Sequence, residues 1–216
     1  MDQPASVLCL LPTKLVGILA LLSLSATAQA AGWERTADTS DGIVVDVKEV
    51  AGQSIVTVRG VWTTKQSPQR LWKAINDLEH YTEFMPYLET AKVLKREGES
   101  AWQYYCLDTP VISDRDYTLK LTKAAEPGKA GKWRVSWTTA NAVGPKPKPG
   151  KVRITVADGS WLLEARNGAK STRITYTVRS DPGGSIPSWI ANRVNRKAVP
   201  DVMRAVVKQS KKSRYK

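Results

Sequence analysis

The sequence predicts an α+β fold in which one long C-terminal helix packs across a curved antiparallel sheet. Three observations lead to this prediction. Short segments of alternating polarity fill most of residues 43–179, turn residues separate these segments, and a long amphipathic segment follows at 186–210. Alternation is typical of strands with one buried face, and a helix with one apolar side needs a sheet or another helix to cover it.

Two strands and a helix are expected first. The strands are predicted at residues 43–50 and 54–62, which are rich in β-branched residues. Ser67 is placed as the N-cap of the helix and Pro68 as its first residue, where a missing N–H group costs nothing. The apolar side of this helix is expected to comprise Leu71, Trp72, Ile75 and Leu78.

The chain between residues 87 and 178 is predicted to be a meander of strands. The expected strands are 90–97, 101–108, 115–124, 132–139, 152–157, 160–166 and 172–179. Asp158-Gly159 and Asn167-Gly168 lie between alternating segments, and such pairs are strong hairpin signals. We therefore expect a tight turn at each pair.

The last helix is predicted from Ile186 to Ser210. Its broad apolar side is expected to comprise Ile186, Ile190, Val194, Ala198, Val202 and Val206, which recur every four residues, with Trp189, Val199 and Met203 beside them. Pro200 lies inside this segment and removes one hydrogen bond of the helix. We therefore expect a kink there.

The N-terminus has the pattern of a signal peptide at residues 1–30. Lys14 precedes the apolar run Leu15–Leu24, and Ala28-Gln29-Ala30 resembles a cleavage site. An apolar run of this length is short for a bilayer crossing, which takes about 20 residues; an uncleaved anchor is the alternative. We expect export to the periplasm, followed by an N-terminal segment at 31–42, one domain at 43–210 and a basic tail at 211–216.

The chain is strongly basic, with 33 Lys and Arg residues against 20 Asp and Glu residues and a net charge of +13. Such a charge favours anionic surfaces. Export and the dispersed charge argue against nucleic acid, so we expect transient contact with an anionic membrane, and a monomer. The expected membrane-contact residues are Lys146, Lys148, Lys208, Lys211 and Lys212. The alternatives are a solubilising loop around Lys146 and a solvated C-terminal end.

The residues that usually carry catalysis or bind metals are scarce. His80 is the only histidine, and Cys106 is the only cysteine outside the predicted signal peptide. No Ser/His/Asp arrangement, cysteine-rich metal motif or phosphate-binding glycine loop is present. We therefore expect no catalytic residues, no metal, no cofactor and no enzymatic activity.

Two motifs resemble those of a known family. Ser113-Asp114-Arg115-Asp116-Tyr117 resembles a strand opening of START (StAR-related lipid-transfer) domains, and the segment 183–192, GGSIPSWIAN, resembles the entry to their last helix. The segments 71–77 and 81–86 are similar to the helix and following turn of the wider Bet v 1-like (SRPBCC) superfamily. The resemblance covers about residues 43–210 and implies a helix-grip fold, with a tunnel that holds a lipid or other hydrophobic molecule.

Alternation along the strands and the position of the last helix select candidate ligand-binding residues. They are Tyr104, Cys106, Tyr117, Leu119, Leu121, Val135, Trp137, Ile154, Trp161, Leu163, Trp189, Ile190 and Val194. The same alternation groups Trp133, Val152, Val156, Ile174, Tyr176 and Val178 on inward faces. The alternative for each of these residues is that it fills a core.

The resemblance also implies where a buried acid–base pair for a ligand head group would lie. Those positions fall near Leu121 and Cys106, neither of which provides such a group, so a sterol is not indicated. Arg115 is expected to pair with Asp114 or Asp116.

Two other functions remain open. A cyclase- or aromatase-type enzyme would need polar groups in the cavity, for which Tyr104, Asp108 and Lys120 are the candidates. A partner-binding scaffold with a filled core would lack a cavity of about 300 Å³ or more, the lower range for ligand sites.

Overall fold

The computed structural model describes residues 32–108, 113–124 and 128–216. The predicted signal peptide lies outside the described residues. The helices are α1 (Pro68–Ile75) and α2 (Ser188–Ser210), with short 3₁₀ turns η1 (Leu78–Glu83), η2 (Lys129–Gly131), η3 (Asn141–Val143) and η4 (Ser213–Tyr215). The strands are β1 (Glu34–Asp38), β2 (Val44–Lys48), β3 (Thr57–Thr64), β4 (Leu88–Glu97), β5 (Ser100–Leu107), β6 (Asp114–Lys123), β7 (Lys132–Thr139), β8 (Lys151–Arg153), β9 (Val156–Arg166) and β10 (Ser171–Asp181).

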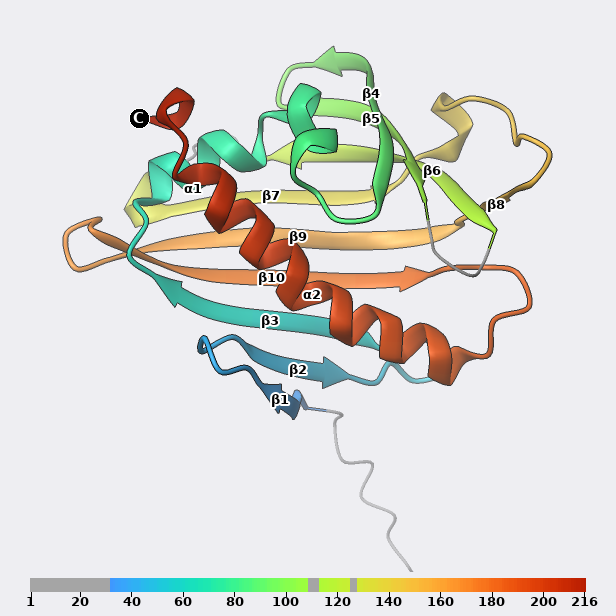
Figure 1. The fold of residues 1–216 in the computed structure, drawn as a ribbon, viewed down its shortest axis with the longest axis horizontal. Coiled ribbons are helices and arrows are strands. Elements are labelled where there is room, and N and C mark those ends of the chain that lie inside the picture. Colours follow the sequence, from blue (N-terminus) through green and yellow to red (C-terminus); the bar gives the residue numbers. More distant parts are fainter. Residues whose placement is uncertain (1–31, 109–112, 125–127) are drawn as a thin grey trace, which may run out of the picture. The chain divides into compact units, whose positions relative to one another are not determined.

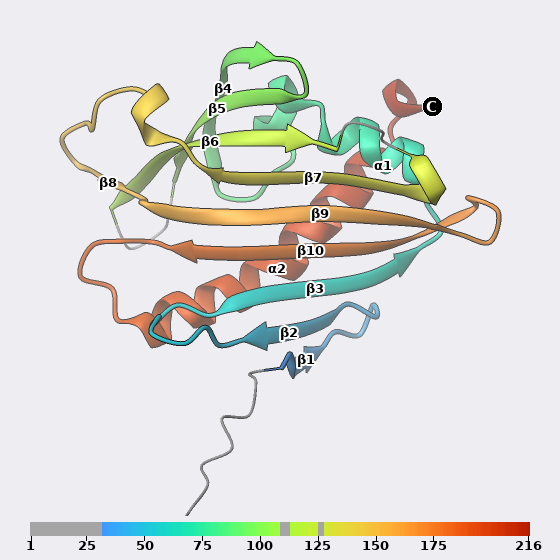
Figure 2. The ribbon, with the colours of Figure 1, turned by 180° about the vertical axis from the view of Figure 1, so that it is seen from behind.

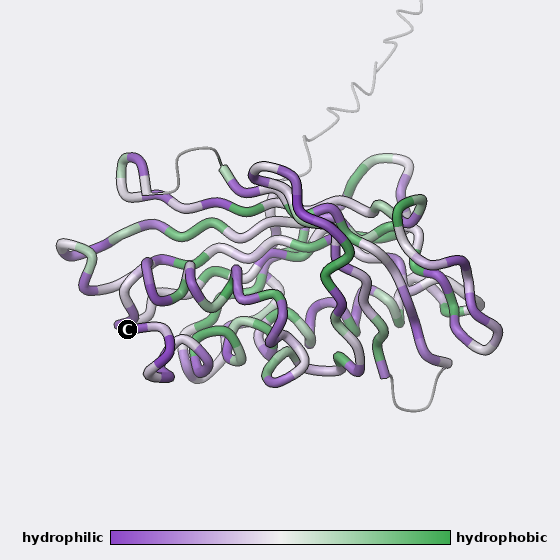
Figure 3. The backbone as a smooth tube through the Cα atoms, turned by 90° about the horizontal axis from the view of Figure 1, so that it is seen from above, coloured by the Kyte–Doolittle hydropathy of each residue, from purple (hydrophilic) through white to green (hydrophobic). Residues whose placement is uncertain are grey.

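These strands form one open, curved sheet in the order β1-β2-β3-β10-β9-β7-β6-β5-β4. Neighbours along this path are antiparallel, and the short β8 pairs with β6 in parallel. α2 lies across one face of the sheet, which we call the inner face, and the opposite face is the outer face (Figures 1 and 2). The predicted α+β helix-grip fold is confirmed. Hydrophobic and hydrophilic residues alternate along the strands (Figure 3), as a sheet with one covered face requires.

α1 begins and packs as its sequence predicts. The Ser67 hydroxyl accepts a hydrogen bond from the Arg70 backbone N–H at 3.4 Å, and Pro68 occupies the first turn. Leu71 and Ile75 are buried in the core. The C-terminal residues dock beside this helix, because Arg70 donates hydrogen bonds to the backbone carbonyls of Lys211 and Lys212. The predicted basic tail is therefore tied to the domain at its backbone.

α2 follows the prediction in its second half only. Val199, Met203 and Val206 are buried, whereas Val194 is 53% exposed. Residues four apart on a helix are separated by about 400°, so a stripe of strict four-residue spacing drifts by about 40° per step. The predicted stripe therefore leaves the sheet toward the N-terminal end of α2. The helix continues through Pro200.

One strand was not predicted, and one turn prediction was wrong. β1 lies within residues 31–42, for which no strand was predicted. Asp158-Gly159 lies inside the continuous strand β9 instead of in a hairpin. A Cβ atom on Gly159 would lie 2.4 Å from Trp137 Cζ2 and 2.3 Å from the Thr177 carbonyl oxygen, so glycine serves close packing there. The turn at Asn167-Gly168 is confirmed between β9 and β10.

Candidate ligand-binding site

A cavity of about 150 Å³ lies on the inner face of the sheet. Its walls come from β4–β7, β9, β10, the segment that joins η1 to β4, and α2. The lining residues are Tyr81, Met85, Pro86, Leu88, Tyr105, Leu107, Tyr117, Leu119, Leu121, Val135, Trp137, Ala157, Trp161, Tyr176, Val178, Ser180 and Val202. Among these lining residues, all of which the structure describes, there is no charged side chain.

The cavity has a buried end and a more exposed end. Leu119, Leu121 and Val135 are buried, and they alternate with outward-facing residues along β6 and β7. Met85, Leu88 and other residues of the lining are only partly buried. The partly buried lining residues come from the η1–β4 connection, the first residue of β4, the end of β5, β6, β10 and α2, and these elements border the cavity's more exposed end.

Aromatic rings form two groups along the lining. In one, the Tyr105 ring lies 6.4 Å from Tyr81 and stacks on Tyr117 at 5.2 Å between centroids. In the other, the Tyr176 ring stacks on Trp161 at 4.2 Å and lies 5.8 Å from Trp137. Tyr105 is paired directly opposite Tyr117, and Trp161 opposite Tyr176, so strand register produces both stacks.

Two of the four tyrosine hydroxyls are held by the protein. The Tyr81 hydroxyl donates to the Ile75 carbonyl at 2.5 Å, and the Tyr105 hydroxyl donates to Gln103 Oε1 at 2.7 Å. Burial raises the pKa of both phenols, so they remain neutral. These bonds fix the two rings against η1 and β5.

The structure brings several predicted ligand-binding residues together and leaves others outside. Those in the lining are Tyr117, Leu119, Leu121, Val135, Trp137 and Trp161. Tyr104 and Cys106 lie on the outer face, since they alternate with Tyr105 along β5. Ile154 and Leu163 are buried outside the lining.

The three predicted residues of α2 are also outside the lining. Trp189 is 65% exposed, Val194 is exposed, and Ile190 is partly exposed. For Ile190 and Val194 the reason is the drift of the four-residue stripe away from the sheet. Val202, farther along the helix, does line the cavity.

Sequence reasoning did not select several lining residues. Met85 and Pro86 belong to the connection between η1 and β4, and Tyr81 and Leu88 lie at its two ends, in η1 and at the first residue of β4; this stretch carries no periodic signal. Tyr105 and Leu107 could have been found by choosing the other face of β5. Tyr176 and Val178 were already placed on an inward face of their strand by alternation.

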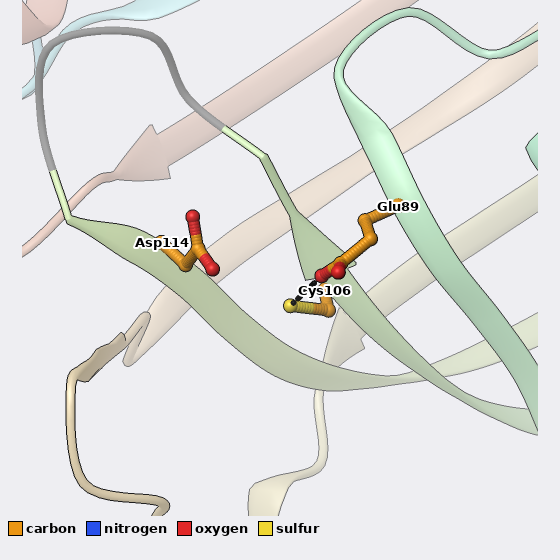
Figure 4. Close-up of side chains that lie close together, drawn as sticks. All are labelled: Glu89, Cys106 and Asp114. Carbon is orange, nitrogen blue, oxygen red and sulfur yellow. Dashed lines mark hydrogen bonds between the residues drawn. The ribbon is translucent and has the colours of Figure 1, made fainter.

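The outer face carries a polar cluster that joins four strands. Glu89, Cys106 and Asp114 place their oxygen and sulfur atoms within 4.8 Å of one another (Figure 4). Lys151 Nζ lies among them, 2.7 Å from Cys106 Sγ, 3.1 Å from Asp114 Oδ2 and 3.3 Å from Glu89 Oε2. Burial raises the pKa of the Cys106 thiol. The lysine ammonium thus occupies the centre of this cluster and ties β8 to β4, β5 and β6.

Asp116 forms the main buried ion pair of the outer face. Arg153 Nε lies 2.6 Å from Asp116 Oδ1 and Nη2 lies 2.9 Å from Oδ2, and the Tyr104 hydroxyl donates to Oδ2 at 3.0 Å. Burial opposes ionisation of this carboxyl, but the hydrogen bonds from Arg153 and Tyr104 lower its pKa. Arg115 was expected to pair with a carboxylate; it donates instead to the carbonyls of Ser113 and Pro182.

The polar groups proposed for an enzyme do not lie in the cavity lining. Tyr104 points to the outer face, and Lys120 is exposed there, with its ammonium 5.0 Å from the Trp102 ring centroid. Asp108 is exposed at the end of β5. The lining therefore offers hydroxyl groups and apolar surface for binding.

The cavity of about 150 Å³ is smaller than the ~300 Å³ at the lower end of ligand sites. In the described conformation this volume has room for a small ring or a chain segment but not for a whole lipid. A second hollow of about 530 Å³ is bordered by exposed residues such as Asp41, Arg166 and Arg173, so it is an open, charged surface.

The predicted membrane-contact lysines lie at two ends of the domain. Lys146 and Lys148 are exposed in the loop that precedes β8, and Lys208, Lys211 and Lys212 are exposed near the C-terminus. Figures 1 and 2 show these regions at opposite ends of the sheet. They do not form one surface. Within the described parts of the chain, no helix has the length and apolar character needed to span a bilayer.

Comparison with known proteins agrees with this architecture. An uncharacterised protein of Pseudomonas aeruginosa is 29% identical over 174 residues, which cover 80% of this chain and 84% of that protein. The phosphatidylcholine transfer protein of Mus musculus is 25% identical over 146 residues, 66% of each chain. A STAR-related lipid transfer protein from Xanthomonas axonopodis superposes with a TM-score of 0.74 at 27% identity, covering 84% of this chain and 99% of that structure.

Human STARD10 shares the fold, with a TM-score of 0.74 at 21% identity over 85% of this chain and 74% of that structure. The predicted relationship to START domains is confirmed by these likenesses. Residues 64–207 match the family described as polyketide cyclase/dehydrase and lipid transport, to which this chain therefore belongs.

Proposed function

We propose that this protein encloses a hydrophobic ligand beneath α2 and carries it between membranes after export. The observation that carries the proposal is the apolar cavity between α2 and the inner face of the sheet. Moving apolar surface from water into such a cavity is favourable by about 25 cal/mol per Å². The likeness to lipid-transfer proteins over most of the chain supports the same class of ligand.

A ligand of lipid size requires an opening in the cavity wall, because the enclosed volume is about 150 Å³. The first half of α2 contributes no residue to the cavity lining, and only Ala191 and Asn192 are buried there before Val199, so little apolar packing holds it beside the end of β10. We therefore place the opening between this half of α2 and the end of β10. Two asparagines hold this half of α2 in place: Asn192 Oδ1 accepts a hydrogen bond from the Val56 backbone N–H, and Asn195 Nδ2 donates one to the Ser180 carbonyl oxygen.

The same half of α2 is the part we propose to contact the membrane. Trp189 and Val194 are exposed large apolar residues, and Arg193, Arg196 and Lys197 are exposed beside them. Tryptophan is favoured at membrane interfaces, and basic side chains near an anionic bilayer contribute about 1 kcal/mol each. This surface, rather than the scattered lysines at the two ends of the domain, combines apolar and basic groups at the proposed opening.

Export is proposed from residues 1–30, whose n-region, apolar run and small residues resemble a secretory signal. The test is expression with the natural N-terminus, cell fractionation and N-terminal sequencing of the purified protein. Recovery from the periplasm with a new N-terminus near Ala31 supports export. Recovery of the uncut chain in the cytosol contradicts it.

Ligand enclosure is tested by organic extraction of the purified protein followed by mass spectrometry, and by exchange of labelled lipid between vesicles. Ala157 is buried in the lining, so Ala157→Leu narrows the cavity. Ala142→Leu is the matched control, because Ala142 is exposed outside the lining. We expect the first substitution to reduce the extracted ligand and the exchange rate, and the second to leave both unchanged. No extractable ligand and no exchange by the wild-type protein would refute the proposal.

Membrane docking is tested separately with vesicles that contain or lack anionic lipid. Trp189→Ala is expected to weaken vesicle binding, whereas Trp33→Ala removes an exposed tryptophan outside α2 and serves as the control. Equal binding by wild type and Trp189→Ala would contradict the assigned surface.

The second candidate is a partner-binding scaffold with a filled core, which the small cavity volume favours. It predicts no bound lipid, no exchange and unchanged stability when apolar compounds are added. A rise in melting temperature with added apolar compound would instead favour ligand binding.

A further inference from the structure

We infer that the part of the ligand that enters this cavity is a flat, uncharged ring that carries a carbonyl or hydroxyl group. The inference rests on the proposed ligand-binding function and specifies the chemical class of the ligand. It follows from three properties of the lining: the absence of charge, two unpaired phenol hydroxyls, and the two aromatic groups.

The first property excludes a charged group from the cavity. The described lining consists of aliphatic and aromatic side chains, a proline, and one serine. The ionised groups of the outer face, including the Asp116–Arg153 pair, are engaged with one another on the other side of the sheet. Burial of an ion without a partner carries a penalty of several kcal/mol. A phosphate, ammonium or carboxylate therefore has to remain outside.

The second property supplies a polar contact for a neutral group. The hydroxyls of Tyr117 and Tyr176 make no hydrogen bond to any residue within 32–108, 113–124 or 128–216, although both residues line the cavity. This distinguishes them from Tyr81 and Tyr105, whose hydroxyls are held by the protein.

Burial raises the pKa of Tyr117, and burial together with the neighbouring Tyr117 raises the pKa of Tyr176. Both phenols are therefore neutral donors at physiological pH. Neither hydroxyl oxygen is fully buried, because among the described residues Thr118 Oγ1 is the fully buried side-chain atom without a partner. A ligand oxygen that accepts from either phenol therefore replaces a contact with water by a hydrogen bond inside the apolar cavity. A carbonyl or hydroxyl oxygen is the neutral group that can do so.

The third property favours a flat ring over a flexible chain. The stacked pairs Tyr105–Tyr117 and Trp161–Tyr176 present aromatic surface, and planar rings pack on such surface in offset or edge-on geometry. An apolar cavity of about 150 Å³ is known to accept a molecule of the size of benzene. The volume of this cavity is the same, so one ring with a small substituent fits without an opening of the wall.

The test uses four small probes of similar size in calorimetric or NMR titrations with the wild-type protein. Acetophenone is flat with a carbonyl, α-methylstyrene is its apolar isostere, acetylcyclohexane carries the carbonyl on a puckered ring, and benzoate is flat and charged. We expect acetophenone to bind at least threefold more tightly than acetylcyclohexane and at least tenfold more tightly than benzoate. Tighter binding of benzoate or of acetylcyclohexane would overturn the inference.

The hydroxyls are tested with the double variant Tyr117→Phe/Tyr176→Phe. Acetophenone is expected to lose about three- to tenfold in affinity per hydrogen bond removed. The affinity for α-methylstyrene is expected to stay the same or increase, and comparing the two probes cancels their different hydration. Tyr87→Phe is the control, because Tyr87 is exposed and lies outside the lining.

The outcomes separate this inference from the function on which it rests. If both neutral aromatic probes bind but the double variant affects them equally, the inference is refuted while ligand binding stands. If neither probe binds the wild-type protein, the proposed function fails and the inference fails with it.

Discussion

Removal of the Asp116 carboxylate should destabilise the domain severely, because it leaves a buried cation without its partner. Asp116 is 0% exposed, and the Arg153 side chain that it binds is 15% exposed. In Asp116→Ala, the guanidinium keeps, among the described residues, only the Pro145 carbonyl, at 3.0 Å, as a hydrogen-bond acceptor. Breaking a buried ion pair by removing one partner costs about 3–5 kcal/mol, a large share of the stability of a domain of this size, about 5–15 kcal/mol.

The assay is urea denaturation followed by circular dichroism, with the double variant Asp116→Leu/Arg153→Met measured beside each single variant. Because the double variant leaves no unpaired charge, we expect it to be more stable than either single variant. Glu97→Ala is the control: Glu97 forms an exposed ion pair with Lys95 at 2.8 Å, and such pairs contribute about 1 kcal/mol or less. Losses below about 1 kcal/mol in the single variants, or additive losses in the double variant, would refute the reasoning.

Three further results are expected from other contacts. In Gly60→Ala, the new Cβ would lie 2.4 Å from Met203 Sδ and 2.7 Å from Val199 Cγ1. We expect the free energy of unfolding, measured by urea denaturation, to decrease by about 1–3 kcal/mol, and Val199→Ala to restore part of this loss. A Gly60→Ala variant of unchanged stability would contradict this contact. Tyr215→Phe removes the hydroxyl that donates to Asp77 Oδ2 at 2.6 Å, and we expect faster amide exchange in residues 211–216, whereas unchanged exchange would count against it. The pKa of Asp116 is lowered in the folded protein, so its contribution to stability is present above the unfolded pKa of about 3.9 and is lost as the pH falls through the folded value. We therefore expect the urea concentration at the unfolding midpoint to decrease when the pH is lowered below about 4. Asp116→Asn should flatten this pH dependence, and an identical pH profile in wild type and variant would contradict the assignment.

The architecture could be predicted from the sequence where local signals agreed with one another. Ser67 and Pro68 start α1 as expected, and Asn167-Gly168 turns between β9 and β10. Asp158-Gly159 has the same local signal as a hairpin turn yet lies within a strand. Its glycine is explained by the approach of Trp137, a contact between strands that no local pattern contains.

The candidate site could be predicted only along regular strands. Alternation placed Tyr117, Leu119 and Leu121 on one face, and the cavity uses that face. The choice of face on β5 could not be made in the same way, because every interior residue of this strand is buried. The outer face there is covered by Lys151 and its partners, so burial does not distinguish Tyr104 from Tyr105.

The two halves of α2 are held by different forces, and this difference bears on how a ligand larger than the cavity could enter. The second half is fixed by apolar packing: Met203 and Val199 fit against Gly60, where no side chain intervenes. The first half exposes Trp189 and depends on a few amide hydrogen bonds, such as that from Asn195 to the Ser180 carbonyl at 2.8 Å.

A hydrogen bond that can be exchanged for water contributes only about 1 kcal/mol, whereas uncovering Met203 and its neighbours would expose apolar surface to water. Displacing the whole helix is therefore much costlier than displacing its first half. Ser180 is both the acceptor for Asn195 and a residue of the cavity lining, so the contact that holds the first half of α2 lies at the border of the cavity itself. Contact of Trp189 with a bilayer would offset the loss of that bond at the proposed opening.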